Sequence, residues 1–502
     1  MKPMHFLGID VGTSVTKAAL FDEAFRIIAS ASRPTRVNRP HEGWSETDPE
    51  TVWRNVCDIC REITSVHPSR TIDAIGICGT MVGAWLVDAE GRALRPAITW
   101  EDSRTEAMIE QRLAADPDFL SRIFRSSGNV MQQGCTLPLA RWLIENEPDI
   151  MRRAVALFSS KDFVRMRLTG RIAADRTEAA VAPGSAAARN RSSEMLDLFG
   201  LDEWKHLFPP ALESEAIAGA ITPEAARATG LAEGTPVVVG AGDVPSSIIG
   251  AGGSDPGVVV SILGTTSLNG VIVDRPVFTP RDLGLLFTLP DDLWLRVMVN
   301  VAGTVSLDWF VQTACPDIKD EPDLYARLEE MAEAAGIGAG GAVYLPFLSD
   351  SGIIAPRVER HARAGFAGLS PRHGRGHLAR AVYEGTIMAV RDCFEAMARP
   401  FDTIRLIGGG ARSAFWSQML ADVTGHKVEV PEGEEFGARG AALLAATGIG
   451  RFASVRQASR ETFSLARSYQ PDKAAGEAYE RAYERYGLCR DAFLDGIAKG
   501  WA

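Results

Sequence analysis

A glycine turn between two short apolar runs, close to the start of the chain, has the composition of a phosphate-binding element. The segment FLGIDVGTSVTKAALFD reads as strand, tight turn and strand, with Gly12, Thr13 and Ser14 in the turn and Lys17 in the second strand. Backbone N–H groups, hydroxyls and an ammonium group are the donors that bind phosphate oxygens. Neither G-x-x-x-x-G-K-[ST] nor a strand-bound G-x-G-x-x-G is present, and both of those motifs open into a helix. The sequence therefore predicts a phosphate-binding β-hairpin.

The second half of the chain repeats this device. VVVSILGTTSLNGVIV again reads as strand, turn and strand, with Gly264, Thr265 and Thr266 in the turn. Further along, DTIRLIGGGARSAFWSQMLADVTG reads as strand, glycine-rich turn and helix, and its three glycines allow the backbone to lie flush against a planar or anionic ligand. Two hairpins that face one cleft would hold a polyphosphate from both sides.

Other polar residues stand where apolar runs end. TIDAIGICGTMVGAWLVD and ALRPAITWEDSR read as strands whose ends carry Thr80, Trp100, Asp102 and Arg104. In GTPVVVGAGDVPSSIIGAG a buried strand ends just before Asp243, and the proline two positions later marks the first turn of a helix. Ligands of open α/β sheets bind beyond such strand ends, so these residues are candidates by position.

The elements that must position these residues are too many for one core. The chain has 502 residues, whereas single hydrophobic cores stop growing at roughly 250–300 residues. We expect two α/β domains, at residues 1–250 and 251–502. No run approaches the roughly 18 apolar residues of a membrane span, and a net charge of −11 argues against a nucleic-acid partner.

The cysteines and the N-terminal segment favour a reduced, cytoplasmic protein. MKPMHFLGID shows no basic region followed by an apolar stretch and a cleavage site. The seven cysteines are odd in number and lie mostly in apolar runs, which favours buried thiols over disulfides. Cys57 and Cys60 fall in an expected amphipathic helix and are interpreted as packing residues. His373 and His377 have glycines between them, which favours a loop-to-helix junction over a metal site.

Taken in order, these segments resemble the FGGY carbohydrate kinases over nearly the whole chain. The first hairpin is similar to the family's phosphate motif, GAGDVPSSIIGAG to the segment with its catalytic aspartate, SILGTTSLNG to its second phosphate loop and LIGGGARSAFWSQMLADVTG to its adenosine loop. KDFVRMRLTGRIAADRTEAA and GFAGLSPRHGRGHLARAVYEGTIMAVRD also match the family pattern. Several motifs in the right order are far more specific than one.

The resemblance implies a fold and a reaction. The fold is the two-domain actin/hexokinase-like fold of ribonuclease-H-like topology, with the active site in the interdomain cleft. The sugar is bound mainly by the first domain and ATP mainly by the second. The implied reaction is ATP-dependent phosphorylation of a sugar, such as a pentulose or another ketose, or of a polyol.

The resemblance also implies roles for the two aspartates. Asp243 would orient the acceptor hydroxyl and accept its proton during direct in-line transfer, the alternative being a residue that only caps the following helix. Asp10 would hold Mg²⁺ through waters, the alternative being a turn-capping side chain. Further nucleotide-binding residues are Gly12, Thr13, Ser14, Lys17, Gly264, Thr265, Thr266, Gly303, Asp308, Gly409, Gly410, Ala411 and Ala414. An exposed strand lysine is the alternative interpretation of Lys17.

The resemblance also implies residues that bind the sugar, namely Thr80, Met81, Val82, Trp100, Asp102 and Arg104, together with Asp243. Xylulose kinases usually show Gln-Met-His-Gly where this chain has Thr-Met-Val-Gly, and the Arg-Glu pair of glycerol kinases is missing as well. Losing a histidine donor removes one hydroxyl contact, so the substrate is open to sugars other than D-xylulose. A surface ion pair is the alternative for Asp102 and Arg104.

Two other classes share parts of this pattern. An ATP-dependent switch protein, like actin or the related heat-shock chaperones, would bind Mg-ATP with similar hairpins but would lack a sugar pocket, and Asp243 together with TWEDSR favours the kinase. An activator ATPase with an iron–sulfur cluster is disfavoured because paired exposed cysteine motifs are lacking. The expected partner is a small-molecule sugar or polyol, and a homodimer is compatible with the sequence.

Overall fold

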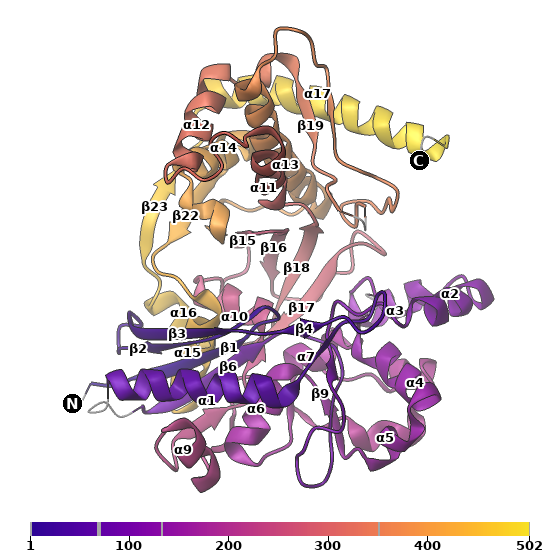
Figure 1. Ribbon diagram of the computed structural model, residues 1–502, viewed down its shortest axis with the longest axis vertical. Helices are drawn as coiled ribbons and strands as arrows, with labels where there is room; N and C mark the ends of the chain where they lie inside the picture. Colours follow the sequence, from indigo (N-terminus) through magenta and orange to yellow (C-terminus); the bar gives the residue numbers. More distant parts are fainter. Residues whose placement is uncertain (1–2, 68–71, 132–133, 350–351, 501–502) are drawn as a thin grey trace.

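Two separate mixed sheets form the centres of the two halves of the chain (Figure 1). The structure, a computed structural model, describes residues 3–67, 72–131, 134–349 and 352–500. The first sheet has the order β12-β13-β6-β1-β2-β3, with β14 beside β6. Its strands are β1 (Phe6–Val11), β2 (Val15–Phe21), β3 (Ile27–Pro34), β6 (Ala74–Gly79), β12 (Ile217–Ala220), β13 (Pro236–Val238) and β14 (Ala241–Gly242).

The second sheet has the order β17-β18-β16-β15-β21-β22-β23. Its strands are β15 (Val259–Leu263), β16 (Ser267–Val273), β17 (Leu285–Leu289), β18 (Leu293–Asn300), β21 (Thr403–Ile407), β22 (Lys427–Pro431) and β23 (Leu465–Tyr469). Four smaller sheets complete the strands: β4 (Val37–Asn38), β5 (Glu46–Thr47) and β8 (Ala97–Ile98); β7 (Trp85–Val87) and β9 (Ala156–Phe158); β10 (Ala174–Asp175) and β11 (Ala211–Leu212); β19 (Val343–Leu345) and β20 (Gly365–Ala367).

The two large sheets share one plan. β1 pairs antiparallel with β2 and parallel with β6, and β15 pairs antiparallel with β16 and parallel with β21. A third strand continues each antiparallel run, namely β3 in the first sheet and β18 in the second. Both predicted hairpins are therefore present, and the internal repeat seen in the sequence is a repeat of structure. The predicted two-domain α/β fold class is confirmed.

Helices cover these sheets. In the first half they are α1 (Pro49–Val66), α2 (Glu106–Ala115), α3 (Phe119–Ser127), α4 (Thr136–Asn146), α5 (Pro148–Arg153), α6 (Ser160–Thr169), α7 (Arg176–Val181), α8 (Ser193–Leu198), α9 (Pro223–Thr229) and α10 (Asp243–Gly250), with the 3₁₀ turn η1 (Asp202–Leu207). In the second half they are α11 (Val305–Ala314), α12 (Leu324–Ala335), α13 (Arg375–Met397), α14 (Ala414–Thr424), α15 (Phe436–Gly448), α16 (Val455–Glu461) and α17 (Lys473–Ala498), with η2 (Ala339–Gly341) and η3 (Gly409–Arg412).

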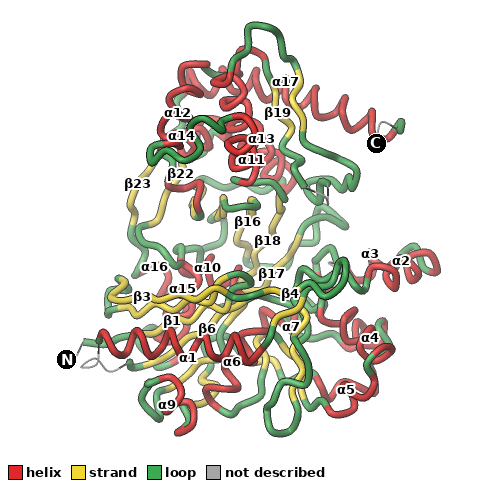
Figure 2. The backbone as a smooth tube through the Cα atoms, in the orientation of Figure 1, coloured by secondary structure: helices red, strands yellow, loops and turns green. Residues whose placement is uncertain are grey.

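Helix α1 shows how local signals set these elements. The Asp48 side chain accepts hydrogen bonds from the backbone N–H groups of Glu50 and Thr51, so it satisfies donors that the helix itself leaves open. Cys57 and Cys60 lie on the buried face of α1, and none of the seven cysteines forms a disulfide. Figure 2 shows α1 lying along the first sheet and α17 at the far end of the second half.

The two halves exchange helices across their boundary. A Cβ atom added to Gly8 of β1 would lie 1.8 Å from the backbone oxygen of Ala438, and one added to Gly76 of β6 would lie 1.7 Å from that of Ala441. Helix α15 therefore lies directly on the first sheet, and Figure 1 shows α15 and α16 beside the strands of the lower half. In return, Ile248 of α10 joins an apolar cluster that is made mainly by the strands of the second sheet.

This exchange refines the expected domain division. The expected boundary after residue 250 falls between the end of α10 and the start of β15. However, α15 and α16 belong to the second half by sequence and complete the core of the first. Strand β17 of the second half is also bonded to the first half. The backbone N–H of Leu286 donates to Oδ1 of Asn129 at 2.9 Å, and the Arg189 guanidinium donates to the carbonyl of Leu289 at 2.7 Å.

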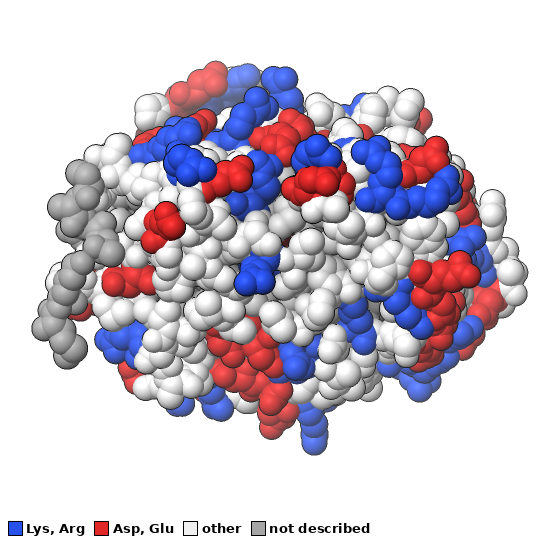
Figure 3. All heavy atoms as spheres, turned by 90° about the horizontal axis from the view of Figure 1, so that it is seen from below, with Lys and Arg blue, Asp and Glu red and all other residues white. Residues whose placement is uncertain are grey.

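The surface carries no large field of one sign on the face that Figure 3 shows. Basic and acidic side chains lie intermingled there around a band of uncharged atoms. In the described ranges, no helix is both long and apolar enough to span a lipid bilayer.

Candidate active site

Two cavities are lined in part by residues of helix α10. The larger has a volume of about 490 Å³ and is lined by Asp10 and Lys17 of the first hairpin, by Ser247 of α10, and by residues of the second half. The smaller has a volume of about 210 Å³ and is lined by Asp243, Met81, Val82 and Trp100 of the first half, and by Leu268, Leu285 and Phe287 of the second. The site therefore uses residues from both halves of the chain.

Asp243 opens helix α10 without capping it. Gly242 occupies the capping position, and Oδ1 of Asp243 accepts the N–H of its neighbour Val244 at 2.8 Å. The carboxylate lines the smaller cavity, while Ser247, one turn further along α10, lines the larger. The two cavities therefore lie within one helical turn of each other along α10.

The two aspartates influence each other. Burial raises the pKa of Asp243 to about 7, and the negative charge of Asp10 adds to the rise. Burial likewise raises the pKa of Asp10 to about 6, against the lowering effects of the Cys78 thiol and of Lys17. A carboxylate with a pKa near neutrality suits a general base, because it can both accept and release a proton at working pH.

The surroundings of Asp10 leave room for a hydrated cation. Its Oδ1 atom is buried and accepts no hydrogen bond from a described residue. Gly437 of α15 faces Oδ2, and a Cβ atom at that position would lie only 2.6 Å from this oxygen. Among the residues that the structure describes, no cluster of three or more His, Cys, Asp or Glu side chains could hold a metal. One carboxylate and open space suit Mg²⁺, which keeps most of its waters and shares its remaining ligands with phosphates.

Lys17 meets the second half of the chain within the larger cavity. Its Nζ lies 3.1 Å from Oε2 of Glu435, and both residues line this cavity. Glu435 has a φ of 53° and stands immediately before α15. Such a backbone conformation in a non-glycine residue often marks a functional site. The sequence gave no indication of this pair, because its members are 418 positions apart.

The first hairpin turn reaches toward the acceptor side. Gly12 and Thr13 line a third cavity, of about 20 Å³, together with Thr80 and Trp100. The indole N–H of Trp100 donates to Oγ1 of Thr13 at 2.9 Å, and the hydroxyl of Thr80 lies 3.1 Å from that of Ser160. Trp100 therefore connects the turn of the phosphate hairpin with the wall of the smaller cavity.

The second hairpin stands between the two larger cavities. Ile262, before its turn, lines the 490 Å³ cavity, and Leu268, after its turn, lines the 210 Å³ cavity. Thr265 and Thr266 are exposed and line neither, although the carbonyl of Thr265 accepts the N–H of Gly303 at 2.8 Å. Ser14 and Asp308 are exposed too, and the Asp308 carboxylate accepts a hydrogen bond from Tyr325 at 3.3 Å.

The glycine-rich turn contributes a floor to the larger cavity. Gly409 and Ala411 line it, whereas Gly410 is buried against Leu263 of β15. Gly408 has a φ of 94°, a conformation that side chains rarely adopt, so the turn depends on glycine at this position. Ala414 begins helix α14 and does not line the cavity.

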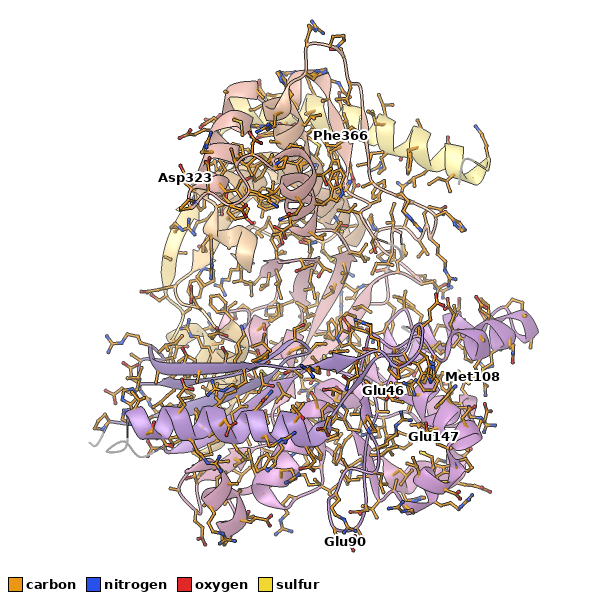
Figure 4. All side chains as sticks on the ribbon, viewed as in Figure 1. Glu46, Glu90, Met108, Glu147, Asp323 and Phe366 are labelled. Atoms are coloured by element: carbon orange, nitrogen blue, oxygen red, sulfur yellow. The ribbon has the colours of Figure 1, made fainter. Side chains whose placement is uncertain are left out.

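Asp102 and Arg104 are not among the described residues that line the two cavities, and their expected role in sugar binding stays a prediction. Nε of Arg104 donates to Asp102 at 2.8 Å, and its Nη2 donates to Glu46 at 2.7 Å. The guanidinium stacks 3.8 Å above the ring of Trp44, and the Arg104 side chain is only 1% exposed. The pair is therefore a buried network and not the surface ion pair considered as its alternative. Figure 4 places Glu46 and Glu147, two acidic residues of this network, in the lower half; Arg95 binds both.

Helix α7 holds the walls of the smaller cavity from behind. The backbone N–H of Val82 donates to Oε1 of Glu178 at 2.9 Å, and the N–H of Gly242 donates to Oγ1 of Thr177 at 2.9 Å. Val82 has a φ of 56°, which is a strained conformation for a β-branched residue. Glu178 is buried, and burial raises its pKa to about 8. Sequence reasoning missed both α7 residues, since they act through the backbone of their neighbours.

Removing the Glu178 side chain should loosen the wall of the smaller cavity and leave the larger cavity intact. We expect Glu178→Ala to raise the KM for the acceptor about 10-fold, because a buried N–H then loses its partner, and to leave the KM for ATP nearly unchanged. Glu178→Gln retains the accepting oxygen and should behave like the parent. Steady-state kinetics with each substrate varied in turn would measure the split. Equal changes in the two KM values would mean that Glu178 only stabilises the fold.

Comparisons with known proteins identify the family. Residues 5–250 match the N-terminal domain, and residues 259–449 the C-terminal domain, of the FGGY family of carbohydrate kinases. The chain is 33% identical to a xylulose kinase of Escherichia coli (96% of this chain, 97% of the relative) and 32% identical to an erythritol kinase of Brucella abortus (98% of each).

Solved structures give the same result. A xylulose kinase from Rhodospirillum rubrum superimposes with a TM-score of 0.87 at 28% identity, over 98% of this chain and 100% of that one. A gluconate kinase from Lactobacillus acidophilus reaches 0.90 at 23% identity over 99% and 100%, which is a likeness of fold. This chain therefore belongs to the FGGY family of carbohydrate kinases and is a two-domain sugar kinase.

Proposed function

We propose that the smaller cavity binds the acceptor alcohol, that the larger binds ATP, and that Asp243 acts as the general base between them. The observation that carries this assignment is the position of α10, which presents Asp243 to one cavity and Ser247 to the other. In this arrangement the Asp243 carboxylate orients the acceptor hydroxyl and accepts its proton as the oxygen attacks the γ-phosphorus in line.

The nucleotide lies against the glycine-rich turn. Gly409 and Ala411 line the space that we assign to the adenosine, and Asp10 and Lys17 of the first hairpin line the part of the same cavity that we assign to the phosphates. Lys17 leaves Glu435 and pairs with the phosphoryl group under transfer. This exchange is inexpensive, because Lys17 and Glu435 are 39% and 27% exposed and an ion pair of this kind contributes at most about 1 kcal/mol.

Asp10 holds the Mg²⁺ ion that accompanies the nucleotide, through the ion's water shell. When bound, the ion supplies positive charge that offsets the charge developing on the phosphates. The chain's own contribution is the buried Oδ1 of Asp10 and the absence of a side chain at Gly437. Both features keep the volume beside the carboxylate free for a hydrated ion.

The acceptor is a ketose, such as a pentulose, or a polyol. Support comes from the relatives, which include kinases named for xylulose and for erythritol. We place the reaction in the cytoplasm, and the protein acts as a monomer or a homodimer. The family match gives no support to the alternative of an actin-like or chaperone-like switch.

The direct test is ADP release from Mg-ATP across a panel of ketoses and polyols, with the phosphorylated product identified by mass spectrometry. We expect ATP turnover to depend on an acceptor and to yield a sugar or polyol monophosphate. ATP hydrolysis at the same rate with every acceptor and without one, and with inorganic phosphate as the product, would contradict the proposal and favour a switch protein.

A further inference from the structure

The wall of the smaller cavity is apolar almost throughout. Of the side chains that line its 210 Å³, twelve are aliphatic, phenyl or sulfur-containing, and they include Met81, Val82, Val181, Val244, Leu285 and Phe287. The remaining lining residues that the structure describes are Trp100, Asn129 and Asp243. A polyhydroxylated ligand needs a hydrogen-bonding partner for each hydroxyl group that it buries.

The side-chain amide of Asn129, the indole N–H of Trp100 and the backbone N–H of Val82 already form hydrogen bonds within the protein, whereas the Asp243 carboxylate faces the cavity. The Asn129 amide donates to the carbonyl of Ser127 at 2.8 Å and accepts the N–H of Leu286 at 2.9 Å. The indole N–H of Trp100 is donated to Thr13, and the backbone N–H of Val82 to Glu178. Asp243 is the one charged group among the described lining residues.

Such a wall discriminates between ligands because it offers no partner to their hydroxyl groups. A ligand hydroxyl that loses water and gains no partner costs roughly 1–3 kcal/mol. A methyl or methylene group in the same place gains about 0.8 kcal/mol per carbon from burial. Each hydroxyl that faces this wall therefore weakens the complex, and each deoxy carbon strengthens it.

Resting on the proposed function, we infer that the acceptor is a deoxy or methyl-bearing polyol or ketose: one end presents a hydroxyl to Asp243, and the carbon skeleton beyond it lies against the apolar wall. In the family resemblance, Val82 stands where xylulose kinases usually have histidine, so the difference in wall chemistry falls on a residue that lines this cavity. The same surface gives a fully hydroxylated pentulose too few partners.

The test compares matched acceptors that differ by one remote hydroxyl. Erythritol would be assayed beside its terminal deoxy analogue, and D-xylulose beside its terminal deoxy analogue, by ADP release with Mg-ATP. We expect each deoxy compound to show a kcat/KM about 10- to 100-fold higher than its parent, the range by which one hydroxyl is discriminated in an apolar pocket. A parent that reacts as well as or better than its deoxy analogue would overturn the inference.

Binding separates this inference from the proposed function. Calorimetric titration of the nucleotide-free protein with the same four compounds requires no phosphoryl transfer. Tighter binding of the deoxy members without ADP release would keep the inference and refute the kinase assignment. ADP release together with tighter binding of the hydroxylated members would keep the kinase assignment and refute the inference. Equal binding, or none, would also overturn the inference.

A pair of variants at Val82 makes the test specific. Val82→Thr has the shape of the parent residue and the same β-branch, so it adds a hydroxyl without adding backbone strain. It should reduce the preference for the deoxy acceptor several-fold. Val82→Ala removes volume and adds no polar group, so it should retain the preference. Residues 132–133 lie outside the described ranges; if Gln132→Ala with Gln133→Ala selectively abolished turnover of the hydroxylated acceptors, polar contacts from that segment would overturn the inference.

Discussion

Replacing Asp243 by asparagine is expected to lower kcat by about 100- to 10,000-fold, the range attributed to a positioned general base. The amide retains the hydrogen bond from the N–H of Val244, so the turn that opens α10 keeps its geometry. It cannot accept the acceptor's proton. Asp58→Asn, on the exposed face of α1, is the matched control and should leave kcat unchanged.

The same substitution should stabilise the nucleotide-free protein at alkaline pH. The pKa of Asp243 is about 7 in the folded chain, above its ordinary value of 3.8, so the folded carboxylate holds its proton where the unfolded one has lost it. Folding stability therefore falls as pH rises from about 4 to about 7, by at most about 4 kcal/mol at higher pH. Asparagine carries no charge and avoids this loss.

Denaturant unfolding at about pH 5 and about pH 8 would measure the effect. The stabilisation by Asp243→Asn should be larger at the higher pH. In the parent, kcat/KM for the acceptor should rise with pH and level off above about 7, as the base loses its proton. Full turnover in the variant would refute the catalytic role. An inactive variant that is also less stable at both pH values would indicate structural damage instead.

Replacing Asp10 by asparagine should raise the Mg²⁺ concentration required for half-maximal activity by about 10- to 100-fold, as for carboxylates that hold a metal through its waters. Saturating Mg²⁺ should recover much of the lost rate. A readout independent of turnover is the Mg²⁺-dependent rise in Tm of the ADP-bound protein, which the variant should need more Mg²⁺ to reach.

Asp10→Asn should also act on Asp243. The negative charge of Asp10 contributes to the raised pKa of Asp243, so the variant should lower that pKa and move the pH-dependent loss of stability to lower pH in the metal-free protein. An unchanged Mg²⁺ requirement together with an unchanged pH profile would exclude Asp10 from both roles. Glu434→Gln, an exposed acidic neighbour in the same cavity, serves as the control.

Local chemistry made the hairpins and the glycine-rich turn predictable. A strand, a Gly-Thr-Ser or Gly-Thr-Thr turn and a second strand are specified by neighbours in the chain, and both hairpins formed as expected. The start of α1 is specified in the same local way, because the capping residue Asp48 is followed directly by Pro49. The placement of Asp243 at the first residue of a helix followed from the same kind of signal.

Contacts between distant segments were not predictable in this way. Nothing near Arg104 in the sequence indicates that Glu46 and Trp44 enclose it, and its expected role in sugar binding stays a prediction. The pairing of Lys17 with Glu435 and the hydrogen bond from Val82 to Glu178 form only when segments far apart in the sequence are folded together. The apolar character of the acceptor wall likewise appears only when strands of the second half are brought against the first.

The exchange of α10 and α15 has a consequence for synthesis on the ribosome. The face of the first sheet that α15 covers remains bare until residue 448 has been translated, although that sheet's last strand ends at residue 242. At roughly 5–20 residues per second, the remaining stretch takes on the order of 10–40 s. During that interval the nascent N-terminal half exposes apolar surface, which makes it a natural client for chaperones that bind chains before their release.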